Sequence, residues 1–443
     1  MAYYYLETLG CPKNTVDAEG MARLLAQVGY AGTPDPAQAD VLIVNTCGFI
    51  EAARAESLAV LRELAAHKRS GQLLIAAGCL SQRWGPALAD AVPDLDGVLG
   101  TRCWMDILPL LDRLKRRRKQ PVVMCQPHDR MDDPLVRTQR VAVQGSTAYL
   151  KIADGCSVPC AFCAIPAIKG PARSRPLADV VADAEHLVRR RIQEIILIAQ
   201  DTTAYGWDRG ERDGLPELME RILNRVPELP WLRLLYAYPQ HVSPRLIEVM
   251  ASHPQVCHYL DLPLQHAHPE VLRRMRRPAN MDAVCHLIAA LRSAMPDIVL
   301  RTSFIVGYPG EAEEEFQALL DFMAEIQFDR VGVFTYSREE GTPAADLPGQ
   351  LPEAVKEERY RQVMELQQGI SLARNQEMVG RTLEVLIEGC DEEVSVGRSY
   401  RDAPEIDGLV LVEGKLPIGK MVPVRITEAL EYDLAGTFVE REA

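Results

Sequence analysis

The sequence has 443 residues, and its length, composition and charge exclude several classes of protein. Hydrophobic residues make up 47% and charged residues 25%, which excludes wholesale disorder and predicts a folded, soluble chain of about two to four domains. Lys and Arg total 49 against 62 Asp and Glu, so the formal net charge is −13. A chain this acidic is not a protein that binds nucleic acids along their whole length. Its negative electrostatic field suits a basic protein partner better.

The sequence shows no pattern typical of membrane or secreted proteins. No apolar run approaches the roughly 18 residues that a membrane helix needs, and the N-terminus lacks the basic stretch and apolar core of a signal peptide. We therefore expect a cytoplasmic protein. Eleven cysteines are many for a reducing compartment, where disulfides rarely persist, so some of them should bind metal or react.

The N-terminal region, residues 1–125, alternates strand-like and helical patterns. Apolar runs at residues 3–8, 41–45 and 73–77 predict strands, and the patterns at 15–28, 50–67 and 82–91 predict helices. This alternation predicts a parallel sheet. The basic run at 115–119 is interpreted as a solvated helix end, with RNA contact as the alternative. Residues 126–141 are polar and irregular, which is typical of a linker.

The rest of the chain divides into a second α/β domain, residues 142–375, and a small β-domain, residues 376–443. Strands are expected at 149–152, 194–199, 233–237, 259–262, 299–306 and 330–334, which suits an open or partial β/α barrel. A charged amphipathic helix is expected over 353–379. Short β-type runs at 383–387, 409–412, 421–426 and 436–439 then predict a small, OB-like β-barrel.

Three cysteines directly after a predicted strand form the densest motif. Cys156, Cys160 and Cys163 have the spacing C-x3-C-x2-C, and three thiolates this close can hold three corners of an iron–sulfur cube. The fourth iron then keeps an open position. Zinc is an alternative, but zinc usually takes four ligands in short-spaced pairs and no fourth Cys or His is near. Core packing is the other alternative, and three thiols in one proline-containing loop make a poor core.

A second set, Cys11, Cys47 and Cys79, is widely spaced in sequence, yet each residue follows a predicted strand and precedes a helix. In a parallel sheet such loops all lie at one edge, where ligands bind. Each cysteine also has a glycine neighbour, which lets backbone approach a bulky cofactor. Three independent buried cysteines are the alternative. The pattern favours a second metal site.

The other five cysteines show no comparable pattern. Cys103, Cys125, Cys257, Cys285 and Cys390 are interpreted as structural residues. Cys257, together with nearby His258, His266 and His268, could suggest zinc, but these residues bracket a buried-looking strand and a helix start.

The first cysteine motif, with Phe162 before its last cysteine, resembles the radical S-adenosylmethionine (SAM) superfamily. The resemblance implies a 4Fe–4S cluster whose open iron chelates SAM, and a radical formed by cleaving SAM. Gln200 and Gly307, at predicted strand ends, are candidates to line the SAM pocket, with turn formation as the alternative. Arg301 could bind a carboxylate of SAM or substrate, or form a structural salt bridge.

Both cysteine sets, followed by a small β-domain, resemble the methylthiotransferases, whose N-terminal domain carries an auxiliary cluster and whose C-terminal domain is called TRAM. Two segments resemble the RimO branch, which modifies a ribosomal protein: Leu9-Gly10-Cys11-Pro12-Lys13-Asn14 and Cys163-Ala164-Ile165-Pro166-Ala167-Ile168-Lys169-Gly170. The resemblance implies two 4Fe–4S clusters, with Cys11, Cys47 and Cys79 holding the auxiliary one. It also implies methylthiolation of an aspartate β-carbon on small-subunit ribosomal protein twelve, with two SAM molecules per turnover.

The alternatives are the same chemistry on a tRNA adenosine and a non-enzymatic iron–sulfur sensor or carrier. Residues 381–443 hold seven basic and fourteen acidic residues, a balance of −7, which should repel phosphates and attract a basic ribosomal protein. We therefore expect no strong nucleic-acid binding. Open three-cysteine coordination argues against a pure carrier, which normally closes its cluster with four ligands. An electron donor such as flavodoxin or ferredoxin is a further expected partner.

Overall fold

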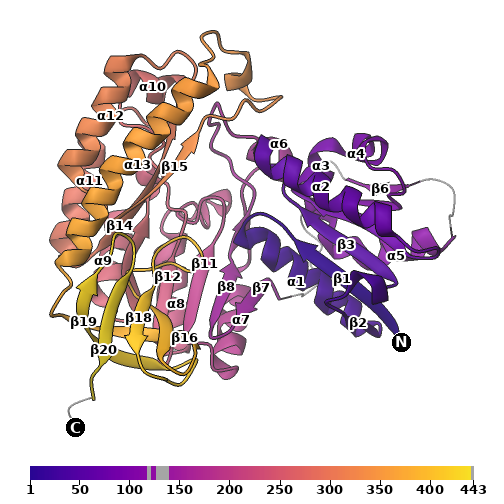
Figure 1. The fold of residues 1–443 in the computed structure, drawn as a ribbon, viewed down its shortest axis with the longest axis horizontal. Helices are drawn as coiled ribbons and strands as arrows, with labels where there is room; N and C mark the ends of the chain where they lie inside the picture. Colours follow the sequence, from indigo (N-terminus) through magenta and orange to yellow (C-terminus); the bar gives the residue numbers. More distant parts are fainter. Residues whose placement is uncertain (117–120, 126–138, 441–443) are drawn as a thin grey trace. The chain divides into compact units, whose positions relative to one another are not determined.

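The computed structural model describes residues 1–116, 121–125 and 139–440. The chain forms two compact units, shown with the element labels in Figure 1. The first unit comprises Met1–Ala142, Tyr149–Ser174 and Ser337–Ala345, and the second comprises Val143–Ala148, Arg175–Tyr336 and Asp346–Ala443. Most of the predicted linker and part of the basic run at 115–119 lie outside the described residues.

The first unit contains a six-stranded parallel sheet with the order β2-β1-β3-β4-β5-β6. Its strands are β1 (Ala2–Thr8), β2 (Tyr30–Gly32), β3 (Val41–Thr46), β4 (Leu73–Gly78), β5 (Gly97–Gly100) and β6 (Val122–Met124). The parallel sheet and three of its strands were predicted. Strands β2, β5 and β6 are only three or four residues long, too short to show a period in sequence.

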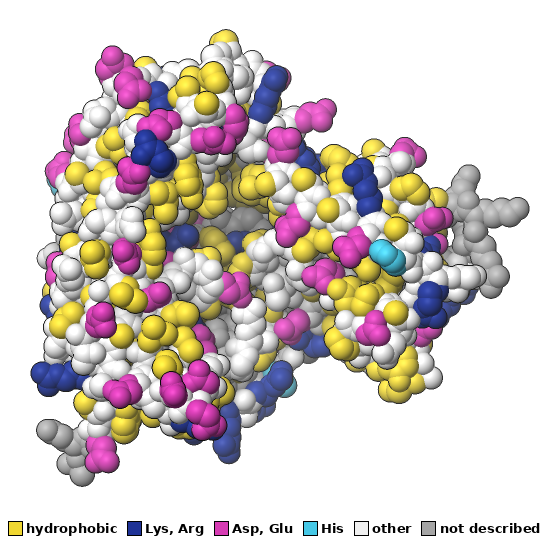
Figure 2. Space-filling model, in the orientation of Figure 1, with side chains coloured by type: hydrophobic (Ala, Val, Ile, Leu, Met, Phe, Trp, Pro, Cys, Tyr) yellow, Lys and Arg dark blue, Asp and Glu magenta, His cyan; other side chains and the backbone are white. Residues whose placement is uncertain are grey.

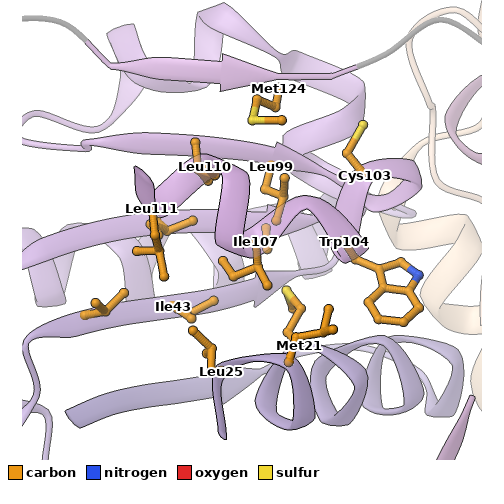
Figure 3. Close-up of a cluster of buried hydrophobic side chains, with 14 of the residues drawn as sticks. Met21, Leu25, Ile43, Leu99, Cys103, Trp104, Ile107, Leu110, Leu111 and Met124 are labelled. Atoms are coloured by element: carbon orange, nitrogen blue, oxygen red, sulfur yellow. The ribbon is translucent and has the colours of Figure 1, made fainter. Parts of the chain in front are cut away.

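Helices cover both faces of this sheet because alternate strand residues are apolar on both sides. One face packs against α1 (Pro12–Gln27), the 3-10 helix η2 (Thr101–Asp106) and α5 (Ile107–Arg116), and Figure 3 shows part of this core, including Met21, Ile43 and Trp104. The other face packs against α2 (Glu51–His67), α3 (Cys79–Trp84) and α4 (Pro86–Ala91). The single helix predicted over 82–91 is wrong, because Gly85, at φ +51°, separates α3 from α4.

The central sheet has seven strands in the order β15-β14-β13-β12-β11-β8-β7. The six predicted strands occur as neighbours, and β7 adds an edge that the sequence did not indicate. The strands are β7 (Val141–Gln144), β8 (Thr147–Lys151), β11 (Glu194–Ile198), β12 (Trp231–Leu234), β13 (Val256–Asp261), β14 (Val299–Val306) and β15 (Arg330–Thr335). From β11 to β15 all neighbours are parallel, as expected for an open β/α barrel.

Helices follow the parallel strands of this sheet. They are α7 (Leu177–Arg189), α8 (Gly214–Arg225), α9 (Pro244–Ser252), α10 (Pro269–Arg274), α11 (Met281–Ala294) and α12 (Glu313–Ile326). Short elements complete the description: η1 (Pro36–Gln38), β9 (Ala153–Asp154), α6 (Ile165–Lys169), β10 (Arg173–Ser174), η3 (Trp207–Arg209), η4 (Pro239–His241) and η5 (Pro343–Asp346). None of the helices in the described ranges is long and apolar enough to cross a membrane.

The charged helix α13 (Glu353–Gln376) leads into a closed barrel with the strand order β16-β17-β18-β20-β19. Its strands are β16 (Thr382–Cys390), β17 (Val394–Ser399), β18 (Val410–Glu413), β19 (Met421–Ala429) and β20 (Leu434–Phe438). Their inward-facing Val, Leu and Ile side chains form one buried core. The predicted small β-barrel is confirmed. Strand β17 was missed because its serines and glycine resemble a turn.

Buried ion pairs join this small barrel to the central sheet within the second unit. Glu194, on β11, accepts hydrogen bonds from Arg233 Nε at 2.6 Å and from Arg398 Nη2 at 2.6 Å. Arg233 lies on β12 and Arg398 on β17, and all three side chains are at most 1% exposed. Arg330, on β15, binds Asp402 at 2.8 Å in the same way. The small barrel is therefore fixed to the sheet rather than loosely tethered.

Candidate functional site

Cys11, Cys47 and Cys79 follow three neighbouring strands of the parallel sheet, β1, β3 and β4. Cys11 caps the N-terminus of α1, Cys47 lies in the loop after β3, and Cys79 is the first residue of α3. The three thiols are close enough that the charges of Cys11 and Cys47 both act on Cys79. The structure thus brings together, at one sheet edge, residues that are 36 and 32 positions apart in sequence.

The glycines beside these cysteines allow the cysteine loops to approach one another. A Cβ atom on Gly10, which has φ +92°, would lie 2.9 Å from Cys47 Sγ. A Cβ atom on Gly48 would lie 2.7 Å from the backbone nitrogen of Leu80. The sequence-based interpretation assigned these glycines to contact with a cofactor. In the structure these glycines serve the packing of one cysteine loop against another, because a side chain at either position would push the loops apart.

Asn14 holds two of these loops in place. In the sequence, only its place in the segment from Leu9 to Asn14 distinguished this residue. Its side-chain amide donates to Leu9 O at 2.9 Å and to Thr46 O at 3.1 Å, and its Oδ1 is 3.6 Å from Cys79 Sγ. Burial raises the pKa of Cys79 to about 12 and also raises that of Cys47. Both therefore stay neutral thiols at pH 7 unless a metal binds, which favours the thiolate.

The first cysteine motif, C-x3-C-x2-C, lies in the same unit, in the loop between β9 and α6. Cys156, Cys160 and Cys163 are each half-buried, as is Phe162. Backbone hydrogen bonds fix this loop: Cys156 N–H donates to Gly170 O at 2.9 Å and Cys163 N–H to Cys160 O at 3.2 Å. The loop is thus preformed, with three partly accessible thiols within eight residues of chain.

The donor sets fit iron–sulfur cubes better than a single ion. Within the described ranges, no three His, Cys, Asp or Glu side chains are placed to hold one metal ion. A cube binds each thiolate through a different iron, so its ligands stand further apart than those of one zinc ion. The three thiols of the constrained loop between β9 and α6 suit that requirement.

The remaining predicted site residues lie in the second unit, whereas the cysteine motif lies in the first. Gln200 is half-buried just after β11, and its Oε1 has no hydrogen-bond partner among the described atoms. Gly307, at φ +73°, follows β14, and a Cβ atom there would meet the Lys356 side chain at 2.4 Å. The glycine is therefore required for packing whether or not it also contacts SAM. Arg301 binds Asp261 at 2.8 Å and Asp407 at 3.5 Å, which supports its structural alternative.

Two non-glycine residues at neighbouring strand ends have left-handed backbone conformations that sequence reasoning missed. Tyr236, after β12, has φ +63°, and Gln265, after β13, has φ +76°. Such conformations cost free energy and concentrate at functional sites. Both residues lie at the carboxyl end of the central sheet, where barrel enzymes bind their substrates.

Comparison with known proteins matches three families along the chain. Residues 3–100 match "Uncharacterized protein family UPF0004", residues 150–323 the radical SAM superfamily, and residues 379–439 the TRAM domain. A protein of Chloroflexus aurantiacus named ribosomal protein uS12 methylthiotransferase RimO is 51% identical, over 98% of this chain and 99% of that protein. A Roseiflexus protein with the same name is 50% identical, over 99% and 98%. The chain belongs to the RimO family of methylthiotransferases.

Membership confirms the resemblance, the three-part fold and the enzyme class predicted from sequence. As a radical SAM enzyme, the chain uses SAM and a 4Fe–4S cluster. A solved structure also resembles it: TsrM of Kitasatospora setae, a radical SAM methyltransferase, is 15% identical with a TM-score of 0.56, over 78% of this chain and 74% of that one. At this identity the likeness supports the fold alone.

A buried carboxylate ties the segment after β15 to the cysteine-bearing domain of this RimO-family chain. Glu339 is 2% exposed and binds Arg83 at 2.7 Å, together with Arg54 and Ser337. Arg83 lies on α3, the helix that begins at Cys79. Ala344 N–H, from the same segment, donates at 2.9 Å to Ala161 O, which lies between Cys160 and Cys163. The segment Ser337–Ala345 therefore holds both cysteine regions within the first unit.

Removing the charge of Glu339 should destabilise the protein in a pH-dependent way. Burial opposes the charge on Glu339, but hydrogen bonds from Ser337 and the two arginines outweigh it and lower its pKa. A lowered carboxyl pKa stabilises the fold above the unfolded value of about 4.3, and that contribution is lost as pH falls towards the folded pKa. Glu339→Gln should lower the free energy of unfolding by roughly 2 kcal/mol at pH 7 and by less at pH 4, measured by denaturant unfolding.

Its neighbour Glu340 offers the matched control, since its side chain is exposed. Glu340→Gln should leave the midpoint unchanged at both pH values. An equal loss for Glu339→Gln at pH 7 and pH 4 would show that the ionised carboxylate is not what stabilises the segment.

Proposed function

We propose that this chain methylthiolates an aspartate β-carbon of ribosomal protein uS12 to give 3-methylthioaspartate, using two SAM molecules per turnover. The observation that carries this proposal is the full-length match, at 51% identity, to a protein named for uS12 methylthiotransfer. The tRNA adenosine alternative is not favoured, because relatives that cover the chain from end to end are named for the ribosomal protein.

Cys156, Cys160 and Cys163 would hold the SAM-binding cluster and leave one iron open for SAM. When bound there, cluster and SAM would supply the radical that removes a hydrogen atom from the substrate carbon. Phe162 would shield the cluster, and Gln200 and Gly307 would line the SAM pocket. The preformed loop and the orphaned Gln200 Oε1 support these roles.

Cys11, Cys47 and Cys79 would hold a second 4Fe–4S cluster, which carries the sulfur to be transferred. Their common sheet edge and the close loop contacts at Gly10 and Gly48 support this site. Binding there would convert buried neutral thiols to thiolates and release their protons. Asn14 would keep the loops in register while the cluster is absent.

A basic ribosomal protein suits the TRAM domain better than RNA does. Two of its seven basic side chains, Arg398 and Arg401, are buried, and so are two of its acidic side chains, Asp402 and Asp407, so burial leaves the balance of −7 unchanged. Figure 2 shows Asp and Glu side chains spread over the face of this domain that is in view. Exposed carboxylates repel phosphates and steer a cationic partner. An electron donor such as flavodoxin or ferredoxin, a cytoplasmic location, and domain boundaries at 1–125, 142–375 and 376–443 remain parts of this proposal.

Reversing exposed TRAM charges should slow association with uS12. The candidates for reversal are five acidic residues near the start of this domain, Glu384, Glu388, Asp391, Glu392 and Glu393. The structure excludes two of them. Glu388 binds the buried Arg398, and Asp391 accepts from the backbone of Glu393 and Val394 in a turn. Replacing Glu384, Glu392 and Glu393 with Lys should lower the on-rate about tenfold at low salt, measured by stopped-flow binding of uS12. The effect should shrink as salt screens charges beyond about 8 Å.

The same variant should gain non-specific RNA affinity, because new lysines contact phosphates. Replacement of the three residues with Gln serves as the control, and it should give a smaller effect in the same direction. Tight tRNA binding by the wild-type chain, lost in the Lys variant, would favour the tRNA reaction instead.

Mass spectrometry of uS12 provides the direct test of the proposed function. A bacterial strain that lacks its own RimO should contain unmodified uS12, and expression of this chain should add the mass of one methylthio group on one aspartate. Unchanged uS12 alongside a newly methylthiolated tRNA would overturn the proposal.

A further inference from the structure

A buried lysine in the segment that follows Cys163 lies near the second cysteine set, which is Cys11, Cys47 and Cys79. Lys169 ends α6, the helix that follows Cys163, and its side chain is 2% exposed. Its Nζ lies 3.1 Å from Asp154 Oδ1, 3.6 Å from Asp17 Oδ2 and 3.1 Å from Thr101 Oγ1. These three partners come from different parts of the first unit, so the ammonium group is held in one place.

The position of Lys169 brings its charge to the thiols of Cys11 and Cys79. The Lys169 charge lowers the pKa of Cys79, against the larger effect of burial, and the charges of both thiolates raise the pKa of Lys169. Ala164 and Ile168, from the same segment, pack directly against Cys79. The segment that follows Cys163 therefore covers Cys79, one member of the other cysteine set.

A second lysine in the same network provides a natural comparison. Lys151 is fully buried and binds the same two carboxylates, Asp17 and Asp154. The nearby charges with the largest effects on the pKa of Cys79 include those of Lys169 and Asp17. The two lysines thus share partners and burial, but Lys169 ends the helix whose Ile168 packs against Cys79, whereas Lys151 lies on β8.

A cluster on three thiolates at this site would place negative charge in a buried region. Buried charge is costly unless an opposite charge or hydrogen bonds compensate it. Net charge and hydrogen bonding also set the reduction potential of an iron–sulfur cluster. A fixed cation beside the ligands would favour the reduced, more negative form, and a fixed anion would disfavour it.

We propose that Lys169 is a positioning residue that supplies the counter-charge of the auxiliary cluster, so that the segment carrying the SAM cysteines sets the reduction potential of the second site. This inference rests on the auxiliary cluster of the proposed function. It assigns no contact with substrate to Lys169, which acts through the charge it places beside Cys11 and Cys79.

The test uses the full chain with Cys156, Cys160 and Cys163 replaced by Ala, which should retain only the auxiliary cluster, about four irons. After anaerobic reconstitution, the potential is read by a redox titration followed by electron paramagnetic resonance. Lys169→Met should lower the equilibrium constant for reduction at least tenfold, a shift of about 59 mV to more negative potential. Lys169→Arg should restore a potential near that of the parent, and Lys151→Met should shift it much less.

Asp17→Asn gives an arm of opposite sign, because it removes a carboxylate near Cys79 and keeps Lys169. The potential should then move to more positive values, and this arm decides the matter should Lys169→Met fail to fold. Equal shifts for the two lysine variants, no shift in Lys169→Met, or no positive shift in Asp17→Asn would overturn the inference. Absence of iron in the parent would instead overturn the auxiliary cluster itself, and the inference with it.

Discussion

Replacing Cys11, Cys47 and Cys79 together with Ala should reduce the iron content of the reconstituted chain from about eight to about four. Deoxyadenosine should still form when reductant and SAM are added, because Cys156, Cys160 and Cys163 remain. Transfer of the methylthio group to uS12 should fall below detection, since no second cluster would carry the sulfur. Iron analysis, chromatography of the nucleoside and mass spectrometry of uS12 measure the three outcomes separately.

The reciprocal variant separates the two sites. Replacing Cys156, Cys160 and Cys163 should also leave about four irons, but it should abolish deoxyadenosine formation. A control with three buried or half-buried cysteines outside both sets, Cys103, Cys257 and Cys285, should retain all of the iron. Retention of all iron by the first variant would refute the assignment of the auxiliary site.

The positions of the two cysteine sets at strand ends could be predicted from the sequence, because the patterns that indicate them are local. The first set is a compact motif, and each member of the second set follows an apolar strand within a repeated strand–helix pattern. Parallel-sheet geometry then places the ends of β1, β3 and β4 at one edge. Only the exact starts differ: Cys79 lies on α3 rather than in the loop before it.

The charged networks could not be predicted from the sequence, because their members are far apart in the chain and no sequence period connects them. Lys169 and Asp17 are 152 positions apart, and Glu339 is 256 from Arg83. Lys169, directly after the apolar run from Ala164 to Ile168, was the one available signal for burial with a partner. Composition alone also counts Glu388 as one more acidic residue of the domain, and only the fold shows that this carboxylate binds a buried arginine.

A buried charged network of this kind also surrounds Glu194 in the second unit. Its carboxylate is fully buried between Arg233 and Arg398, so Glu194→Gln would leave two buried guanidinium groups with less compensating charge. Removing one member of a buried ion cluster costs about 3–5 kcal/mol. At about 2–4 °C per kcal/mol for a unit of this size, the melting temperature should fall by roughly 6–20 °C. Glu388, which also binds Arg398, places the loss nearer the lower figure.

Glu185 is the matched control, because it too lies between two arginines, Arg189 and Arg225, but at the surface. Glu185→Gln should leave the melting temperature almost unchanged, since water screens exposed pairs. Because Arg233 and Glu194 lie on the central sheet and Arg398 on β17, Glu194→Gln should also loosen the TRAM barrel, seen as faster amide exchange in β16 and β17. Equal melting temperatures for the two variants would mean that the network does not hold the TRAM barrel on the central sheet.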